Sequence, residues 1–349
     1  VTDFRPTLER EGLSDFMSSM VGLELTTLES GHFNGFPVQR DVTQITRGSF
    51  EWSLRTPDEV FTELRGLGKY GPDKTIVQVN HARDSILGYF SQFDLDPLDA
   101  SITDPVGGSL IANPGSLASV NGPAFRRFRT DDGAECEPGE GAPEDCRMRN
   151  TFSFGFDAME IFNGKRIEQV RSYARPSQIP DDAGLTPEAR EALLAVQPGS
   201  VLCDGEYDED TGQFTGSEVA FPGMVDDWFN LLNRGHRIAG LGNSDAHGAY
   251  LDECGFPRTF VGVGQDDPTR IDDKAVIDSV QKGQLIVTNG PFVQLFVNGS
   301  AVGGEPVKAN GQAEVLIDIQ AAPWVHVDTA RLIRNGSLVE EFEVEIEAG

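Results

Sequence analysis

Short apolar runs that end in polar side chains constrain the fold of this chain most. Residues 75–79 (Thr-Ile-Val-Gln-Val) and 237–241 (Arg-Ile-Ala-Gly-Leu) each have the length of one buried strand. A helix is predicted before the first run, because Thr56, Pro57 and Glu59 form a capping-box pattern and Gly66 lies at the expected end. This alternation of strand and helix favours a parallel α/β sheet or barrel, in which chemistry gathers at the carboxyl ends of the strands.

Polar residues follow both apolar runs directly. Asn80 and His81 follow the first run, and Gly242-Asn243-Ser244-Asp245-Ala246-His247 follows the second. Residues two apart in an extended stretch point to the same side, so Asp245 and His247 offer two ligands to one divalent metal. The alternative for Asp245 is a cap on the next turn.

Three earlier positions carry the same chemistry. Glu24 interrupts the predicted strand 21–27, where a buried carboxylate is costly unless it is paired or binds a metal. His32 lies in the turn-rich segment 31–37 and is either a metal ligand or a hydrogen-bonded structural histidine. Residues 156–162 predict a third strand, in which Glu160 either lines a pocket with Asn163 or is exposed.

The rest of the chain is predicted to form two units. Residues 1–291 are the larger domain, with an irregular insertion at about 92–150 and a short helix near Thr186. Residues 292–349 are predicted as a small β-sandwich-like domain, because Asn-Gly pairs at 298–299, 310–311 and 335–336 are strong hairpin signals. His326 is placed in one of its strands, and His236 at a helix end; both are interpreted as structural.

Charge and cysteine content limit the partners. The net charge of −28 over 349 residues excludes nucleic acid and anionic membranes as partners, and no stretch is long and apolar enough to span a membrane. Cys136 and Cys146 bracket a stretch that cannot form a helix or strand, which favours a disulfide and a periplasmic or extracellular location. The alternative is two free thiols in a cytoplasmic protein. The other cysteines are Cys203 and Cys254.

Four motifs in order resemble the PHP superfamily of metal-dependent phosphoesterases, and in particular its carbaryl-hydrolase-like branch. They are Gly22-Leu23-Glu24, Gly31-His32-Phe33-Asn34, Asn80-His81-Ala82-Arg83 and the segment 242–247, with further likeness at 157–164 and 288–292. The resemblance implies a distorted (β/α)7 barrel. It also implies a centre of two or three metals at the carboxyl ends of the strands.

One departure from the family pattern affects the metal centre. Family members begin with His-X-His and a Thr-Asp-His-type motif, whereas residues 1–6 resemble the segment directly after the second motif. We therefore expect an N-terminally truncated barrel. The resemblance implies one complete metal position at Glu24, His32 and His81, a second that retains only Glu24 and Asp245, and a third that retains only His247. Zinc suits two histidines and a carboxylate, and manganese or iron is the alternative.

The expected function is hydrolysis of a phosphoester by a metal-activated water, with weak or no activity in the truncated chain. Arg83 and Arg258 flank predicted strands and are candidates to clamp an anionic small molecule; the alternative is a surface ion pair for each. The same centre is equally suited to a carbamate, ester or amide. A non-catalytic exported binding protein, in which the β-domain binds the ligand, is the alternative of another class.

Overall fold

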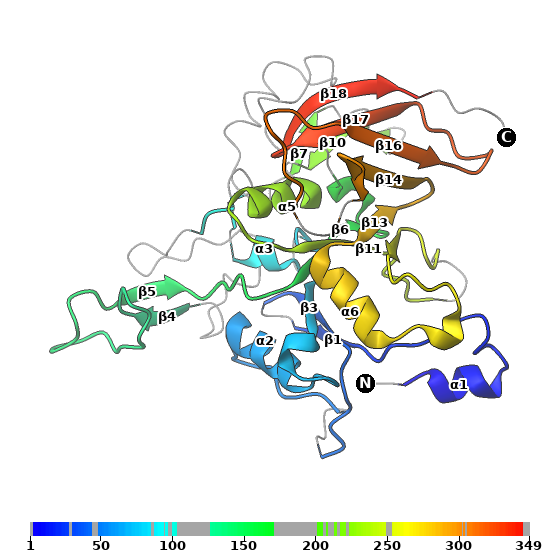
Figure 1. The fold of residues 1–349 in the computed structure, drawn as a ribbon. Coiled ribbons are helices and arrows are strands. Elements are labelled where there is room, and N and C mark those ends of the chain that lie inside the picture. The colour runs from blue at the N-terminus through cyan, green and yellow to red at the C-terminus, as the bar shows by residue number, and fades with distance from the viewer. Residues whose placement is uncertain are drawn as a thin grey trace.

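A five-stranded mixed sheet forms the centre of the protein, as the computed structural model shows (Figure 1). Its strands stand in the order β1-β2-β3-β6-β11. The first three are antiparallel neighbours, whereas β3, β6 and β11 run parallel. The predicted α/β class with parallel strands is therefore confirmed. The strands are β1 (Leu23–Thr26), β2 (His32–Phe36), β3 (Ile76–Val79), β6 (Ala158–Asn163) and β11 (Ala239–Asn243).

The structure describes most of the chain. The described residues are 3–27, 30–43, 48–84, 87–93, 95–96, 100–102, 126–170, 201–204, 207–208, 213–214, 217–220, 223–248, 253–301, 303 and 306–344. The helix expected near Thr186 and residues 103–125 of the expected insertion lie outside these residues. No helix within them combines the length and the hydropathy needed to cross a membrane.

One face of the central sheet packs on two helices, α2 (Pro57–Gly66) and α5 (Met224–Asn233). Phe33, Val77 and Met159 point from the sheet into this core, which also holds Phe61 and Leu231 from the helices. The capping box that predicts α2 is confirmed: Glu59 N donates to Thr56 Oγ1, and Thr56 N donates to a Glu59 carboxylate oxygen at 2.7 Å. Helix α2 therefore begins where its sequence predicts.

The opposite face of the sheet is divided along the strands. At one end Ile76, Ala158 and Leu241 pack with Ile277 and Val280 of helix α6 (Asp273–Lys282). Two residues after Ile76 and Ala158, the side chains on the same face are polar: Gln78 in β3 and Glu160 in β6. An apolar half-core thus supports the strands, and their polar ends are left for the candidate site.

The sheet is open in the described part of the chain. The antiparallel pair β12 (Arg258–Val261) and β13 (Leu285–Thr288) lies next to β11 without joining the five-stranded ladder. The expected distorted (β/α)7 barrel is therefore not seen as a closed barrel in these residues. The physical reason is that β1 and β11 are the two edges, and no described strand bridges them.

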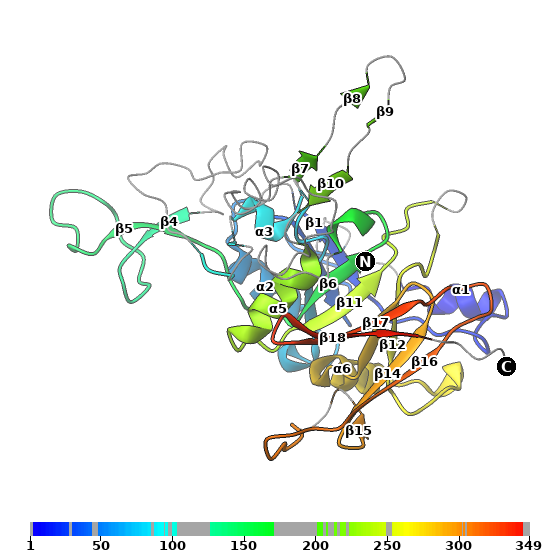
Figure 2. The ribbon, with the colours of Figure 1, turned by 90° about the horizontal axis from the view of Figure 1, so that it is seen from above.

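A disulfide-closed hairpin projects from the main body (Figure 2). It is built from β4 (Arg126–Arg129) and β5 (Arg147–Asn150), which pair in antiparallel register. The predicted bond between Cys136 and Cys146 is present in the loop between these strands. This hairpin belongs to residues 126–150, the longest described stretch of the segment expected at about 92–150. Cys254 is free and exposed.

Residues 292–344 form small antiparallel sheets, in agreement with the predicted β-character of this unit. Asn298-Gly299 and Asn335-Gly336 connect paired strands, and both asparagines have positive φ. The prediction is wrong at Asn310-Gly311, because the described strands on either side of it both pair with β14 and not with each other, and at His326, which lies between strands rather than in one. The strands are β14 (Phe292–Val297), β15 (Ser300–Ala301), β16 (Val315–Gln320), β17 (Thr329–Arg334) and β18 (Ser337–Glu343).

Shorter elements complete the described part of the chain. They are α1 (Arg5–Arg10), α3 (Tyr89–Gln92), β7 (Val201–Asp204), β8 (Tyr207–Asp208), β9 (Gln213–Phe214), β10 (Ser217–Ala220) and 3-10 turns at Pro72–Lys74, Ile167–Gln169 and Pro268–Arg270.

Candidate metal centre

Three neighbouring strands bring the predicted ligands Glu24, His32 and His81 together. In the β1–β2 ladder Glu24 pairs with Asn34 and Thr26 pairs with His32, so Glu24 and His32 point to the same face. Asn80 N donates to the His32 carbonyl at 3.0 Å, which places His81 just past the end of β3 beside β2. Residues far apart in sequence therefore meet because their strands are adjacent.

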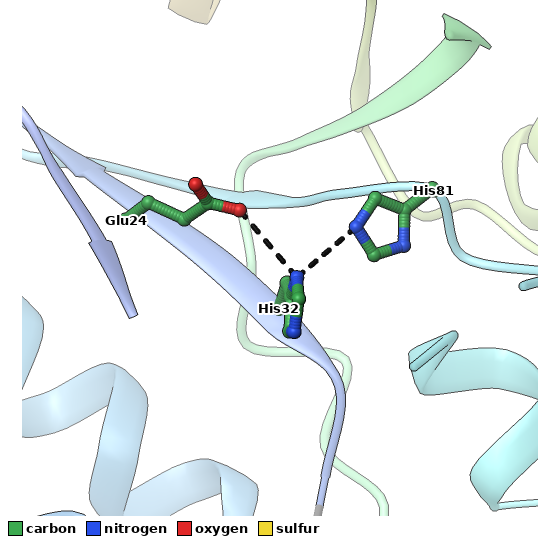
Figure 3. Close-up of side chains that lie close together, drawn as sticks. All are labelled: Glu24, His32 and His81. Atoms are coloured by element: carbon green, nitrogen blue, oxygen red, sulfur yellow. Dashed lines mark hydrogen bonds and ion pairs between the residues drawn. The ribbon is translucent and has the colours of Figure 1, made fainter. Parts of the chain in front are cut away.

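Glu24 and His81 both face the ring of His32 (Figure 3). His32 Nδ1 lies 3.2 Å from His81 Nε2 and 3.5 Å from Glu24 Oε1. One ligand atom from each of the three residues falls within 4.8 Å of the other two, and it is the one group of this kind in the described residues. We call these residues the Glu-His-His cluster.

The environment holds the Glu-His-His cluster in a form suited to a cation. Burial, and then the neighbouring His32, lower the pKa of His81, so this imidazole is neutral at pH 7. The hydrogen bond with His32 lowers the pKa of Glu24, which is ionised at pH 7 although burial opposes this. A neutral imidazole with a free lone pair and a carboxylate are the protonation states that metal ligands require.

Two of the three donor separations match those around a tetrahedral ion. Ligands bound about 2.0–2.1 Å from zinc stand about 3.3 Å apart around a tetrahedron, close to the 3.2 Å between His32 Nδ1 and His81 Nε2 and the 3.5 Å between His32 Nδ1 and Glu24 Oε1. The outer nitrogens His32 Nε2 and His81 Nδ1 are buried and have no hydrogen-bond partner among the described residues. With protons on these outer nitrogens, the two nitrogens that face each other, His32 Nδ1 and His81 Nε2, both present lone pairs to an ion. Without an ion, one facing nitrogen must carry a proton to avoid repulsion at 3.2 Å.

A cavity of about 540 Å³ opens beside the Glu-His-His cluster. Glu24 and His81 line it, and so do the predicted residues Asp245, His247 and Arg258. The structure does not bring Asp245 and His247 into the cluster itself. Their side chains are 21% and 69% exposed, so Asp245 lies deeper than His247 in this wall. The full lining is Glu24, Asn34, Asn80, His81, Glu160, Gly242, Asn243, Ser244, Asp245, Ala246, His247, Gly255, Pro257, Arg258 and Thr259.

Two residues of this region have backbone conformations that side chains disfavour. His81 has φ 27° and Asp245 has φ 51°. Each follows the end of a strand, β3 and β11 respectively. Left-handed backbone at non-glycine residues costs of order 1–3 kcal/mol and is concentrated at functional sites. The surrounding structure therefore holds both residues in place at an energetic cost.

The two arginines predicted to clamp an anion have different surroundings. Arg258 lines the cavity and donates to the Gly255 carbonyl at 3.1 Å, so its prediction stands. The expectation for Arg83 is corrected: its side chain is only 4% exposed and forms a two-bonded ion pair with Asp227 of α5. Arg83 does not line the cavity, because α5 packs directly over the segment that carries it.

Glu160 is buried in the cavity floor, so the exposed alternative is wrong. It is 3% exposed and accepts hydrogen bonds from three N–H groups. Burial nevertheless raises its pKa to about 7, because desolvation outweighs these bonds, with a further contribution from Asp245. Asn163 is also buried, and its amide lies 3.4 Å from Asp245.

This raised pKa predicts a pH-dependent stability. Between about pH 4.5, the value for an unperturbed glutamate, and the folded value of about 7, the unfolded chain releases the Glu160 proton and the folded chain keeps it. Stability is therefore lost as pH rises through this window, by about 3 kcal/mol for Glu160. We expect the unfolding free energy of the metal-free protein, relative to Glu160→Gln, to fall from pH 4.5 to 8 in urea titrations. A pH-independent difference would contradict the raised pKa.

Comparisons with known proteins add no relative. No protein-family profile matches the chain, and no curated protein or solved structure matches it. The candidate site therefore rests on the residues and their geometry.

Proposed function

We propose that this chain is a metal-dependent hydrolase of the PHP type, which holds a divalent ion, zinc in the first place, at Glu24, His32 and His81. The observation that carries the proposal is the convergence of these three donors at separations of 3.2 and 3.5 Å. Glu24, His32 and His81 would hold such an ion with two imidazoles and one carboxylate, a ligand set typical of catalytic zinc sites. An ion held by these residues would supply Lewis-acid chemistry, which can activate water at neutral pH.

The chain's own residues prepare the site for a phosphoester. Glu24 remains ionised beside His32, and His81 keeps an unprotonated nitrogen facing His32 when its proton is on Nδ1. Arg258 stands on the cavity wall, where a guanidinium can bind two phosphate oxygens. These features support an anionic small-molecule substrate.

A carbamate, ester or amide is the second candidate substrate, and one observation favours it. Glu24, Glu160 and Asp245 all line the cavity, whereas Arg258 is its one arginine or lysine among the described residues. This balance of charge repels a dianion more than a neutral substrate. The choice between the two substrate classes therefore depends on how strongly Arg258 and the metal offset three carboxyl groups.

Fold and location belong to the same proposal. We propose that the open sheet, with β12 and β13 next to β11, is part of a distorted barrel of the PHP type. Binding of a second ion at Asp245 and of a third at His247 remains a prediction. Outside the Glu-His-His cluster, each of these positions would have only one of the expected protein ligands. The bond between Cys136 and Cys146 supports export to the periplasm or the cell exterior.

The test combines metal analysis with two substrates. We expect about one zinc per chain by plasma mass spectrometry, and weak, EDTA-sensitive hydrolysis of p-nitrophenyl phosphate that Arg258→Met reduces through a higher KM. Hydrolysis of an aryl carbamate alone would replace the phosphoester by the second candidate. Stoichiometric metal without turnover of either substrate would favour a non-catalytic binding protein. Absence of bound metal after incubation with excess zinc would overturn the proposal.

A further inference from the structure

Three strand ends meet at the carboxylate of Glu160. Oε2 accepts hydrogen bonds from the backbone N–H of His81 at 2.6 Å and from Asn163 Nδ2 at 2.9 Å. Oε1 accepts one from Asn243 Nδ2 at 2.9 Å. The donors follow β3, end β6 and end β11 respectively, so one side chain connects the ends of all three parallel strands.

The bond to His81 determines where its ring points. His81 has φ 27°, a conformation that a side chain adopts only when its surroundings impose it. The Glu160 oxygen accepts the N–H of the buried His81, and leaving such a group unpaired would be costly. With the backbone held in this way, His81 Nε2 stands 3.2 Å from His32 Nδ1.

Glu160 also reaches the segment that carries Asp245. Asn163 Nδ2 lies 2.9 Å from Glu160 and 3.4 Å from Asp245 Oδ2, so one amide bridges the two carboxyl groups. Asn243 precedes Asp245 by two residues and donates to the other Glu160 oxygen. The polar contacts of Glu160 therefore connect the Glu-His-His cluster to the opposite wall of the cavity.

We propose that Glu160 is the positioning residue of this site, which holds His81 in its metal-binding orientation and fixes the Asp245 segment beside it. The inference rests on the proposed function, in which Glu24, His32 and His81 bind a divalent ion. Glu160 acts through its neighbours, because its oxygens are engaged by N–H donors and it lies outside the group of converging ligand atoms.

Cobalt binding to the metal-free protein tests this role without any assay of activity. Glu160→Met keeps the volume of the side chain but accepts no hydrogen bond from His81, so we expect the Kd for Co²⁺ to rise about 10- to 100-fold. The visible spectrum of the bound ion should change as well. Glu160→Gln should stay near the wild-type Kd and spectrum, because its one oxygen can keep the His81 and Asn163 bonds while the Asn243 amide turns.

Asp157 provides a matched control on the same strand segment. Its Oδ2 accepts a hydrogen bond from the backbone N–H of Val77 at 2.8 Å and forms an ion pair with Arg65. Asp157 therefore supports β3 at the end far from the Glu-His-His cluster. We expect Asp157→Ala to lower the urea midpoint but to leave the Kd for Co²⁺ unchanged. An equal loss of affinity in Asp157→Ala and Glu160→Met would reduce Glu160 to a general structural residue and overturn the inference.

The outcomes separate this inference from the proposed function. If the wild-type protein binds no Co²⁺, both are overturned. If it binds Co²⁺ and Glu160→Met binds equally well with the same spectrum, only the positioning role falls. If Glu160→Met does not fold, Glu160→Ala decides, because it also removes the acceptor of the His81 N–H and puts no apolar group of similar size among the buried amides. A loss of affinity in that variant supports the role, and an unchanged Kd overturns it.

Discussion

Replacing His81 by alanine is expected to abolish stoichiometric zinc binding. The loss of affinity should exceed the roughly 10- to 100-fold effect of changing a residue that only supports a metal ligand. The reason is that His81 supplies one of three protein donors, and its Nε2 is the nearest neighbour of His32 Nδ1 at 3.2 Å. The measurement is zinc per chain after dialysis against a buffer of fixed free zinc concentration. Catalytic turnover, if present, should fall in parallel with zinc content.

His326→Ala is the matched control for this experiment. His326 is an exposed histidine in the loop between β16 and β17, so its loss should leave the zinc content unchanged. Full zinc content in the His81 variant, with circular dichroism matching the wild type, would show that the Glu-His-His cluster is a structural contact. Loss of zinc in both variants would point to binding at histidines in general.

The second large effect is on stability and involves the buried pair of Arg83 and Asp227. Asp227 is 0% exposed and its oxygens take two hydrogen bonds from the Arg83 guanidinium, which also donates to the Leu95 carbonyl. Asp227→Ala leaves this guanidinium buried without its counter-charge. We expect a loss of about 3–5 kcal/mol in the free energy of unfolding, measured by urea denaturation.

Two further variants show whether burial of an unpaired charge causes that loss. The double variant Arg83→Met with Asp227→Leu removes both charges and keeps apolar volume, so it should recover most of the stability. The exposed pair of Arg331 and Glu341 provides the comparison, and Glu341→Ala should cost less than about 1 kcal/mol. An equal loss in the double variant would mean that packing of α5, rather than charge, is responsible.

Local chemistry made much of the fold predictable from the sequence. Thr56 and Glu59 satisfy the first N–H groups of α2, and Gly283, with φ 69°, ends α6 where a left-handed residue is needed. Such signals depend only on nearby residues. Asn310-Gly311 has the same local signal as Asn335-Gly336, but the strands on either side of it, β15 and β16, pair with β14 and not with each other. Strand pairing is a long-range property that a dipeptide cannot specify.

The candidate site was predictable in its ligands and less so in their support. Glu24, His32 and His81 stand out because their chemistry interrupts or ends apolar runs. The burial of Glu160 depends on the parallel register of β3, β6 and β11, which the sequence does not encode locally. Arg83 was misassigned for the same reason, since its partner Asp227 is 144 residues away. Asn80 and Asn243 both line the cavity, and their positions at the ends of predicted strands were the available signal.

The Glu-His-His cluster and the opposite cavity wall come from separate stretches of chain. Glu24 and His32 belong to β1 and β2 and His81 follows β3, whereas Ala246, Pro257 and Arg258 line the cavity from beyond β11. In the proposed hydrolase, the wall could therefore vary independently of the residues that would hold the ion. A library randomised at Ala246 and Pro257 would test this separation by directed evolution, because it alters none of Glu24, His32 and His81.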